Sequence, residues 1–384
     1  MTKKRILLIG DFSSVHSELK KSLKILGHEV VLVSSGDGFK NFKRDLDIQK
    51  DAPENTFEKI VGLFLELIGL RGIFFYYSIK PRILALDLSS FDYIQVINVL
   101  AIQRCGALAN ILFWKELKKS KAKIFLCALG TDYAYVKASL HKKLQYNYLA
   151  GLRLTTIIKF IPSLRFYLFP FYGMLYRYAV NVSTKVIPGA YDYFLSYAGE
   201  PKRSSIIPFP INMSLLGTPI ETVPDKIMIF YGKQKGRGLI KGYADFDNLI
   251  TKIKNKFPER FEIIVTESLP YDEYLKVFKN CHLFLDQTNG HDRGINALIG
   301  MAAGKVVFSG GGQESLEPYN LEGLTVKPLL NATPDIEDML RQVEALILDP
   351  SLITKISRSA IQYVKMNHDS IKVAEKYLAL WNVS

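Results

Sequence analysis

The feature that most constrains the fold is a strand, glycine turn, helix and strand at the start of the chain. Lys4–Ile9 is an apolar run typical of a buried strand, and Gly10 follows it directly. Residues 15–27 then carry apolar side chains at helical spacing and end in a glycine, before a second apolar run at Glu29–Ser34. A βαβ unit of this kind predicts a parallel sheet covered by helices.

The same alternation continues along the chain and restarts beyond residue 207. In the first half, further strands are predicted at 93–97, 123–128 and 185–187. In the second half, we expect strands at 226–231, 262–266, 282–285 and 305–308, and helices at 244–256, 271–279, 294–303 and 335–347. A length of 384 residues also favours two domains. The predicted fold is therefore α/β, with two Rossmann-like doubly wound domains that face a cleft.

The expected domain boundaries follow from the restart of the pattern. The first domain is assigned to residues 1–207 and the second to 208–365, with Pro208-Phe209-Pro210 as a stiff hinge. One long helix is predicted over about 351–382. We expect its end, residues 366–384, to cross back onto the first domain.

Composition excludes several classes of protein. Three scattered cysteines and no cysteine/histidine cluster favour reduced thiols in the cytoplasm and argue against a zinc site. The N-terminal apolar run is too short for a signal peptide, and no stretch of about 18 uncharged apolar residues is present to span a bilayer. The net charge of +13 favours an anionic partner: nucleic acid, anionic lipid or a phosphorylated substrate.

The distribution of charge favours lipid. Residues 133–191 contain eight Lys/Arg and thirteen aromatic residues but no Asp or Glu. This mixture suits the headgroup layer of an anionic membrane, and the apolar stretch 60–79 is expected on the same face. We therefore predict a protein peripheral to the inner face of the cytoplasmic membrane. The alternative is buried helices with solvated lysines; nucleic-acid binding is disfavoured because no recognition module is present.

Two loops of the first domain are candidates for binding an acceptor, because ligands of doubly wound sheets bind at the carboxyl ends of strands. The first follows Ile9 and offers Gly10, Asp11, Ser13, Ser14 and His16. His16 is expected at the surface or at the edge of the cleft. The second offers Gly130 and Asp132. Asp132 either caps the next helix or faces the cleft, where it could accept a proton.

A basic glycine loop in the second domain predicts a diphosphate site. It runs from Gly232 to Gly242 and includes Lys233, Arg237 and Lys241. Cations that face a cleft can neutralise a leaving nucleoside diphosphate without a metal, although the loop does not have the Walker order. A solvated basic loop is the alternative.

Two later loops complete the predicted donor site. The segment around His291, Asp292, Gly294 and Asn296 precedes a helix whose N-terminus can hold a phosphate. Gln313 and Glu314 follow a glycine run, and the carboxylate is a candidate ligand for ribose hydroxyls. We expect neither cofactor nor metal, with a nucleoside-diphosphate sugar as substrate.

In these motifs the chain resembles retaining glycosyltransferases of family 4, a group with the GT-B fold, and specifically those of the bacterial surface-polysaccharide type. The matching segments are Ile6–Gly10 with Gly27-His28-Glu29-Val30, Gly130-Thr131-Asp132, Pro208–Asn212, Arg237 with Lys241-Gly242, Ala297–Val307 and Gly311–Glu314. The resemblance implies a metal-independent transfer with retention, in which Arg237 and Lys241 bind the diphosphate. His291 and Ile299 stand where the family places two glutamates.

The missing glutamates leave competing hypotheses open. The leading one is a glycosyltransferase with Asp132, Arg237, Lys241 and His291 as catalytic residues and a glycan or lipid-linked acceptor. The second is a catalytically silent homologue that binds a sugar nucleotide or acts as a scaffold in a glycan-assembly complex. A third, a nucleotide-sugar epimerase, would need catalytic carboxylates and histidines in the cleft.

Overall fold

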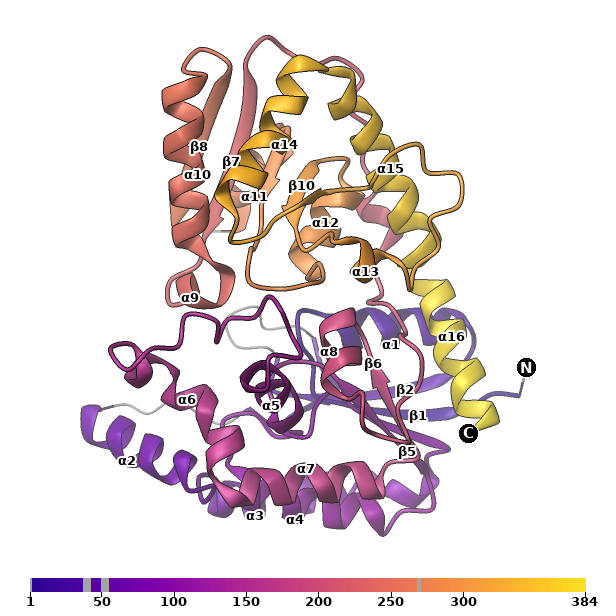
Figure 1. Cartoon of the computed structure of the whole chain (residues 1–384). Coiled ribbons are helices and arrows are strands. Elements are labelled where there is room, and N and C mark those ends of the chain that lie inside the picture. Colours follow the sequence, from indigo (N-terminus) through magenta and orange to yellow (C-terminus); the bar gives the residue numbers. More distant parts are fainter. Residues whose placement is uncertain (1, 37–42, 50–54, 268–270) are drawn as a thin grey trace. The chain divides into compact units, whose positions relative to one another are not determined.

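The computed structural model describes residues 2–36, 43–49, 55–267 and 271–384. The chain divides into two compact units, each built on a parallel sheet (Figure 1). The first unit comprises residues 1–143, 153–210 and 370–384, and the second comprises 144–152 and 211–369. The segment 144–152 thus belongs to the second unit, although it lies within the first half of the sequence. The α/β class with two Rossmann-like domains is confirmed.

The first unit contains a six-stranded parallel sheet of order β3-β2-β1-β4-β5-β6. Its strands are β1 (Arg5–Ile9), β2 (Glu29–Ser34), β3 (Leu46–Asp47), β4 (Tyr93–Val96), β5 (Lys123–Ala128) and β6 (Lys185–Pro188). Ile6 pairs with Val30 of β2 on one side and with Tyr93 of β4 on the other. The side chains of Ile6, Leu7 and Leu8 are fully buried, as expected for a central strand with both faces covered.

The helices of the first unit surround this sheet. They are α1 (Val15–Ile25), α2 (Thr56–Leu67), α3 (Ile73–Leu84), α4 (Ala107–Lys118), α5 (Tyr133–Leu140), α6 (Ile157–Leu168), α7 (Pro170–Val182), α8 (Tyr191–Ser196) and α16 (Ser370–Val383), with a short 3-10 turn, η2 (Leu88–Ser90). α16 packs on α1, and its Trp381 is fully buried against Tyr93 and Phe125. The end of the chain therefore completes the core of the first unit.

The second unit contains a five-stranded parallel sheet of order β11-β10-β9-β7-β8. Its strands are β7 (Ile227–Lys233), β8 (Phe261–Glu267), β9 (Leu283–Leu285), β10 (Val306–Ser309) and β11 (Leu330–Asn331). Its helices are α9 (Gly238–Lys241), α10 (Tyr243–Lys256), α11 (Tyr271–Asn280), α12 (Ile295–Ala302), α13 (Gln313–Leu316), α14 (Ile336–Leu348) and α15 (Ser351–Asn367), with a 3-10 turn, η3 (Met213–Leu215). One apolar cluster joins this sheet to α10 and α14, with Phe246, Met339 and Val343 at its centre.

One element differs from the prediction. The single helix expected over about 351–382 is two helices, because α15 ends at Asn367 and α16 begins at Ser370. The break coincides with the division between the units, which falls at 369/370. The backbone N–H of Ile211 donates to the carbonyl of His368 at 2.7 Å, so the turn between the helices bonds to the start of the second unit.

Candidate functional site

The basic loop of the second unit is shorter than the sequence suggests, because β7 extends through Gly232 and Lys233. Gly232 pairs with Thr266 of β8, so this glycine lies within the sheet. Lys233 is bound by the carboxylate of Asp247, with 2.6 Å between Nζ and Oδ1, and its ammonium lies 5.1 Å from the ring centre of Tyr231. The cations beyond the strand are therefore the ones placed for binding a ligand.

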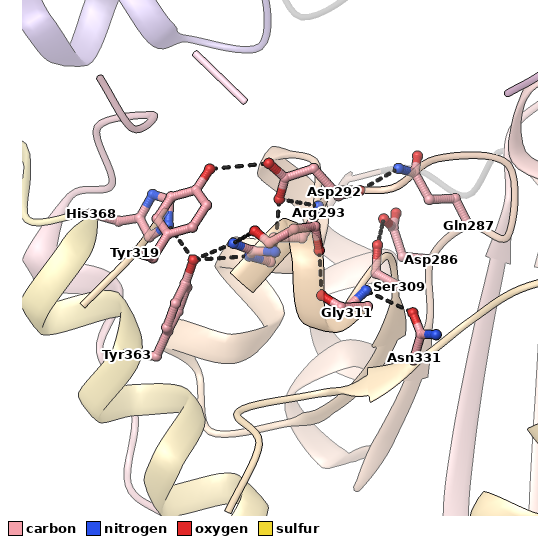
Figure 2. Close-up of polar contacts among 12 residues, drawn as sticks. Asp286, Gln287, Asp292, Arg293, Ser309, Gly311, Tyr319, Asn331, Tyr363 and His368 are labelled. Atoms are coloured by element: carbon pink, nitrogen blue, oxygen red, sulfur yellow. Dashed lines mark hydrogen bonds and ion pairs between the residues drawn. The ribbon is translucent and has the colours of Figure 1, made fainter. Parts of the chain in front are cut away.

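Arg237 and Lys241 lie at the two ends of the one-turn helix α9. Arg237 precedes this helix and is exposed, whereas Lys241 is its last residue and is partly buried. The Lys241 Nζ lies 2.6 Å from Oδ1 of Asp286, whose side chain is only 1% exposed. Ser309 donates to the other carboxylate oxygen of Asp286 at 3.0 Å (Figure 2). This buried carboxylate holds the lysine in place, while 17% of the lysine side chain remains accessible.

A second set of contacts joins the basic loop to the turn after β9. The Thr288 backbone N–H donates to the Lys241 carbonyl at 3.1 Å, and its hydroxyl donates to Asp245 at 2.6 Å. Gly242 has a φ of +69°, and a side chain there would overlap the Thr288 hydroxyl. Only glycine adopts this φ readily and has no side chain to overlap the Thr288 hydroxyl. The close approach of these two loops explains the glycine that the sequence places after Lys241.

His291 is half-buried and bonded to the segment 144–152. Its Nε2 accepts a hydrogen bond of 3.2 Å from the backbone N–H of Tyr146, and the two rings lie 5.3 Å apart. An N–H donor here requires the unprotonated nitrogen at Nε2. Burial lowers the pKa of His291, against the opposing charges of Glu314 and Asp292. The imidazole is therefore neutral at pH 7, and the backbone N–H of Tyr146 orients it. The sequence did not predict this contact.

Asp292, predicted to bind the donor, takes part in a buried ion pair. Its carboxylate is 3% exposed and lies 2.8 Å from Nη1 of Arg293, and Tyr319 donates to its other oxygen at 3.0 Å (Figure 2). Arg293 is enclosed by Tyr319 and Tyr363, whose ring centres lie 4.5 and 5.0 Å from the guanidinium carbon. The carboxylate thus holds the loop together, and a ligand would contact its neighbours instead.

Sequence reasoning missed the whole cage around Arg293. Tyr363 accepts from Arg293 Nε at 3.0 Å, and His368 stacks on Tyr319 with ring centres 5.7 Å apart. Burial lowers the pKa of Arg293, but Asp292, Tyr363 and Tyr319 together outweigh burial and raise it overall. These partners lie far from Arg293 in the sequence, and no motif connects them, so periodicity offers no signal for the cage.

Two helices of the second unit begin beside these loops with glycine at the N-cap. Gly294 precedes α12, and Gly312 precedes α13. Asn296 is half-buried in the first turn of α12, while Gln313 and Glu314 are exposed in the first turn of α13. A glycine N-cap has no side chain to bond the N–H groups of the first turn, and such N–H groups suit an anion.

The turn after β1 in the first unit is closed by Asp11. This carboxylate is fully buried and accepts from the His16 N–H at 2.9 Å and the Ser17 N–H at 3.3 Å. Ser13 and Ser14 have positive φ angles of 49° and 67°, which non-glycine residues adopt at an energetic cost. Both serines are half-buried. An acceptor bound here would meet these serines, since Asp11 already binds the start of α1.

His16 corrects a prediction. It was expected at the surface or at the edge of a cleft, but it is fully buried beneath the turn. Its Nδ1 lies 2.7 Å from the Gly10 carbonyl, and its Nε2 lies 3.2 Å from the side-chain amide of Gln95. Burial lowers its pKa to about 4, although the bond to Gly10 acts in the opposite direction. His16 is a neutral core residue that fixes the backbone of Gly10.

Asp132 caps α5, which is one of the two roles predicted for it. Its Oδ1 accepts from the Tyr135 N–H at 2.9 Å, and its Oδ2 accepts from the Tyr197 hydroxyl. The side chain is 1% exposed, and burial raises its pKa to about 6 despite these hydrogen bonds. Gly130, just before it, has a φ of +75° and lies against Phe12 of the other loop. The two predicted acceptor loops therefore touch, with Asp132 beneath the surface.

Comparison with known proteins supports the fold. No family model matches the chain, and no curated protein matches it in sequence. Sucrose-phosphate synthase from Thermosynechococcus elongatus matches with a TM-score of 0.60 at 12% identity, over 100% of both chains. HepE from Anabaena, in complex with UDP and glucose, matches with a TM-score of 0.59 at 10% identity, over 99% of this chain and 100% of that one.

An epimerase is also among the similar structures. UDP-GlcNAc 2-epimerase from Neisseria meningitidis, bound to UDP-GlcNAc, matches with a TM-score of 0.51 at 11% identity, over 99% of this chain and 100% of that one. The fold is thus shared by proteins of different activities, and at these identities the similarity establishes architecture alone. The expected GT-B fold of this chain, with its two Rossmann-like domains, is confirmed.

Proposed function

We propose that this protein is a glycosyltransferase that moves a sugar from a nucleoside-diphosphate sugar to a glycan or lipid-linked acceptor. The observation that carries the proposal is the pair of cations that follows β7 in the second unit. There Lys241 is held by the buried Asp286, next to an exposed Arg237 and to helices with glycine N-caps. HepE, which shares the fold, binds UDP and glucose.

The proposed chemistry needs positive charge where the leaving group forms. As the bond between the sugar C1 and the diphosphate oxygen breaks, negative charge collects on that oxygen. Arg237 and Lys241 neutralise it in the role that a metal ion plays elsewhere. We therefore propose that the reaction is metal-independent, with Asn296, Gln313 and Glu314 as further contacts to the donor.

Retention is proposed from the family resemblance. The acceptor oxygen attacks C1 from the face that the diphosphate leaves, and the proton of the acceptor hydroxyl passes to the leaving phosphate oxygen. No protein base is then required, which agrees with the burial of Asp132 and with the neutral His291. The neutral imidazole is suited to orienting a sugar hydroxyl by a hydrogen bond. Membership of family 4 itself belongs to this proposal.

The decisive experiment removes one cation. Arg237→Ala should lower donor turnover about a hundredfold or more, because charge on the leaving group loses its partner. The matched control is Arg341→Ala, since Arg341 is also exposed in the second unit and pairs with the nearby Asp338. Wild-type turnover in Arg237→Ala, with the fold intact by circular dichroism, would overturn the assignment.

A catalytically silent, sugar-nucleotide-binding homologue is the second candidate, favoured by His291 and Ile299 at the positions of the family's glutamates. Calorimetric titration with a panel of nucleoside diphosphates should show binding under either hypothesis. Donor hydrolysis and transfer assays on the same panel then separate them. Tight binding without hydrolysis or transfer to any acceptor would select the silent homologue.

We also propose that the protein works at the inner face of the cytoplasmic membrane, where a lipid-linked acceptor would be met. Among the described helices, none combines the length and the hydropathy needed to cross a bilayer. The basic and aromatic segment 133–191 contains α5, α6, α7, β6 and the start of α8, and many of its rings are buried, including Phe160, Phe166 and Tyr172. Part of this segment is therefore core, and contact with lipid must come from its exposed residues and their neighbours.

A further inference from the structure

The helix α2 exposes nearly all of its apolar face. None of its twelve residues is buried, although the sequence is rich in large apolar side chains. Phe57, Ile60 and Phe64 are 75%, 63% and 60% exposed. Their spacing of three and four residues places them along one stripe of the helix. A stripe of this kind is normally covered by another apolar surface.

Neighbouring helices of the same unit add to this apolar surface. On α3, Phe74 is 91% exposed and Tyr77 is 55% exposed. Leu154, just before α6, is 91% exposed, and Ile158 in α6 is 78% exposed. α2 and α6 are seen near one another in Figure 1, and an ion pair of 2.7 Å joins Arg165 of α6 to Glu66 of α2. We call the exposed apolar residues of α2, α3 and α6 the apolar face.

The charges around the apolar face are mainly positive, with Glu58 as an exposed acid on α2. Lys59 on α2, Lys159 on α6 and Arg153 just before α6 are exposed. Of the acidic residues of α2, Glu66 is bound by both Arg71 and Arg165, and Glu58 accepts from Asn55 at 3.0 Å. No acidic residue occurs from Tyr133 to Tyr191. Exposed cations are therefore in excess over acids around the apolar side chains.

We propose that the apolar face docks on an anionic lipid bilayer, with α2 lying in the plane of the headgroups. A helix of twelve residues is about 18 Å long, too short to cross the hydrocarbon core but suited to lie in the interface. Phe and Ile side chains enter the acyl boundary, while the lysines and the arginine bind lipid phosphates. A second copy of the chain is a poorer occupant, because two such surfaces would bring cations together.

This proposal rests on the proposed membrane location and names the surface of the first unit that meets lipid; it includes no residue of the proposed donor site. It can therefore fail while glycosyl transfer is established, and it can hold for a catalytically silent homologue. The test needs no donor and no acceptor, so the two proposals are judged separately.

The experiment is co-sedimentation of the full chain with vesicles at low salt. One set of vesicles is phosphatidylcholine alone, and the other contains equal parts of phosphatidylcholine and phosphatidylglycerol. The wild-type protein should sediment with the anionic set and release at high salt. Phe57→Ser/Phe64→Ser should weaken partitioning about tenfold or more, because two inserted rings are lost. Lys159→Gln should weaken it about fivefold.

The controls remove similar side chains elsewhere on the same unit. Ile25→Ser removes a side chain that is 74% exposed at the end of α1, a helix that Figure 1 draws apart from α2. Lys24→Gln removes an exposed cation beside it. Both should bind vesicles as the wild type does, and all variants should keep the wild-type circular dichroism spectrum, because the substituted side chains are exposed.

Three results would overturn the proposal. The wild-type protein could remain in the supernatant with anionic vesicles, or it could bind both vesicle sets equally. The Phe57→Ser/Phe64→Ser variant could bind as well as the wild type. A dimer seen by light scattering that Phe57→Ser/Phe64→Ser abolishes, without vesicle binding by the wild type, would assign the apolar face to a second copy.

Discussion

The predicted acceptor loops of the first unit and the predicted donor loops of the second use their aspartates differently. In the first unit, Asp11 and Asp132 bond to the backbone N–H groups at the starts of α1 and α5. In the second unit, Asp286 and Asp292 pair instead with Lys241 and Arg293. The helix starts beside those pairs carry glycine N-caps.

The difference indicates where an anion can bind. A carboxylate at a helix N-terminus occupies the N–H groups and adds negative charge, so it excludes a phosphate from that position. An aspartate paired with a cation leaves the N–H groups to a ligand and can hold the cation in place for it. The second unit is therefore the one suited to a diphosphate, and four experiments can test this contrast.

The largest effect should come from breaking the buried pair at Arg293. Arg293→Met leaves the carboxylate of Asp292 buried without its cation, which should lower the free energy of unfolding by about 3–5 kcal/mol. Urea denaturation measures this loss. The double variant Arg293→Met/Asp292→Asn should recover part of it, since no uncompensated charge remains. A loss below about 1 kcal/mol in the single variant would mean that the pair does not organise this loop.

The second largest effect should be the pH dependence of folding stability that His16 causes. Burial lowers its pKa to about 4, whereas in the unfolded chain the imidazole takes up the proton near its ordinary pKa of 6.5. Its contribution to stability is therefore complete above pH 6.5 and is lost as the pH falls toward 4. Between these limits the loss should reach about 3 kcal/mol.

The comparison with His16→Asn isolates this contribution. The stability difference between wild type and His16→Asn should shrink by about that 3 kcal/mol between pH 7 and pH 4. The raised pKa of Asp132 acts in the opposite direction, since a proton bound near pH 6 stabilises the folded form as the pH falls, but it is common to both proteins. A constant difference across this range, measured by urea denaturation, would contradict the burial of a neutral imidazole.

A smaller effect is expected from the cap at Asp132. Asp132→Ala removes the acceptor for the Tyr135 N–H and the Tyr197 hydroxyl, which should cost about 1–2 kcal/mol at pH 7. Asp132→Asn keeps an oxygen at the N-cap and removes a buried charge, so it should stay within about 1 kcal/mol of the wild type. Thermal unfolding of the two variants distinguishes capping from any other role. Equal losses in both would show that the charge itself matters.

The smallest effect concerns Asp286. Asp286→Asn keeps the shape of the side chain but releases Lys241 from its ion pair, so the lysine should become more mobile. We expect donor affinity to weaken by up to about tenfold, or about 1.4 kcal/mol, in calorimetric titration. Asp247→Asn, which releases Lys233 at the other side of the loop, is the matched control and should leave affinity unchanged. If both variants bind the donor as the wild type does, the pair is structural only.

Much of the fold could be predicted from the sequence because parallel strands buried on both faces appear as continuous apolar runs. The predicted strands at 29–34 and 123–128 match β2 and β5 in the structure. The sequence also indicates turns at Gly10 and Gly242, and both residues adopt a positive φ in the structure.

The features that the sequence did not predict depend on contacts between residues that are distant in sequence. The cage around Arg293 and the bond from Tyr146 to His291 join separate segments, which no local pattern can report. The burial of His16 depends on Gln95 from a neighbouring strand. The division between α15 and α16 was missed because helical periodicity continues across His368, while the break is fixed by the backbone bond from Ile211.

The position of α16 has a consequence for how the protein forms in the cell. Tyr377 and Trp381 fill the core of the first unit, and the Tyr93 hydroxyl donates to Asn382 at 2.7 Å. During synthesis from the N-terminus, this unit cannot close until α16 has left the ribosome, after the entire second unit has emerged. Until then its apolar interior is open to chaperones and proteases. The second unit, whose residues are complete at Asp369, can reach its native core first.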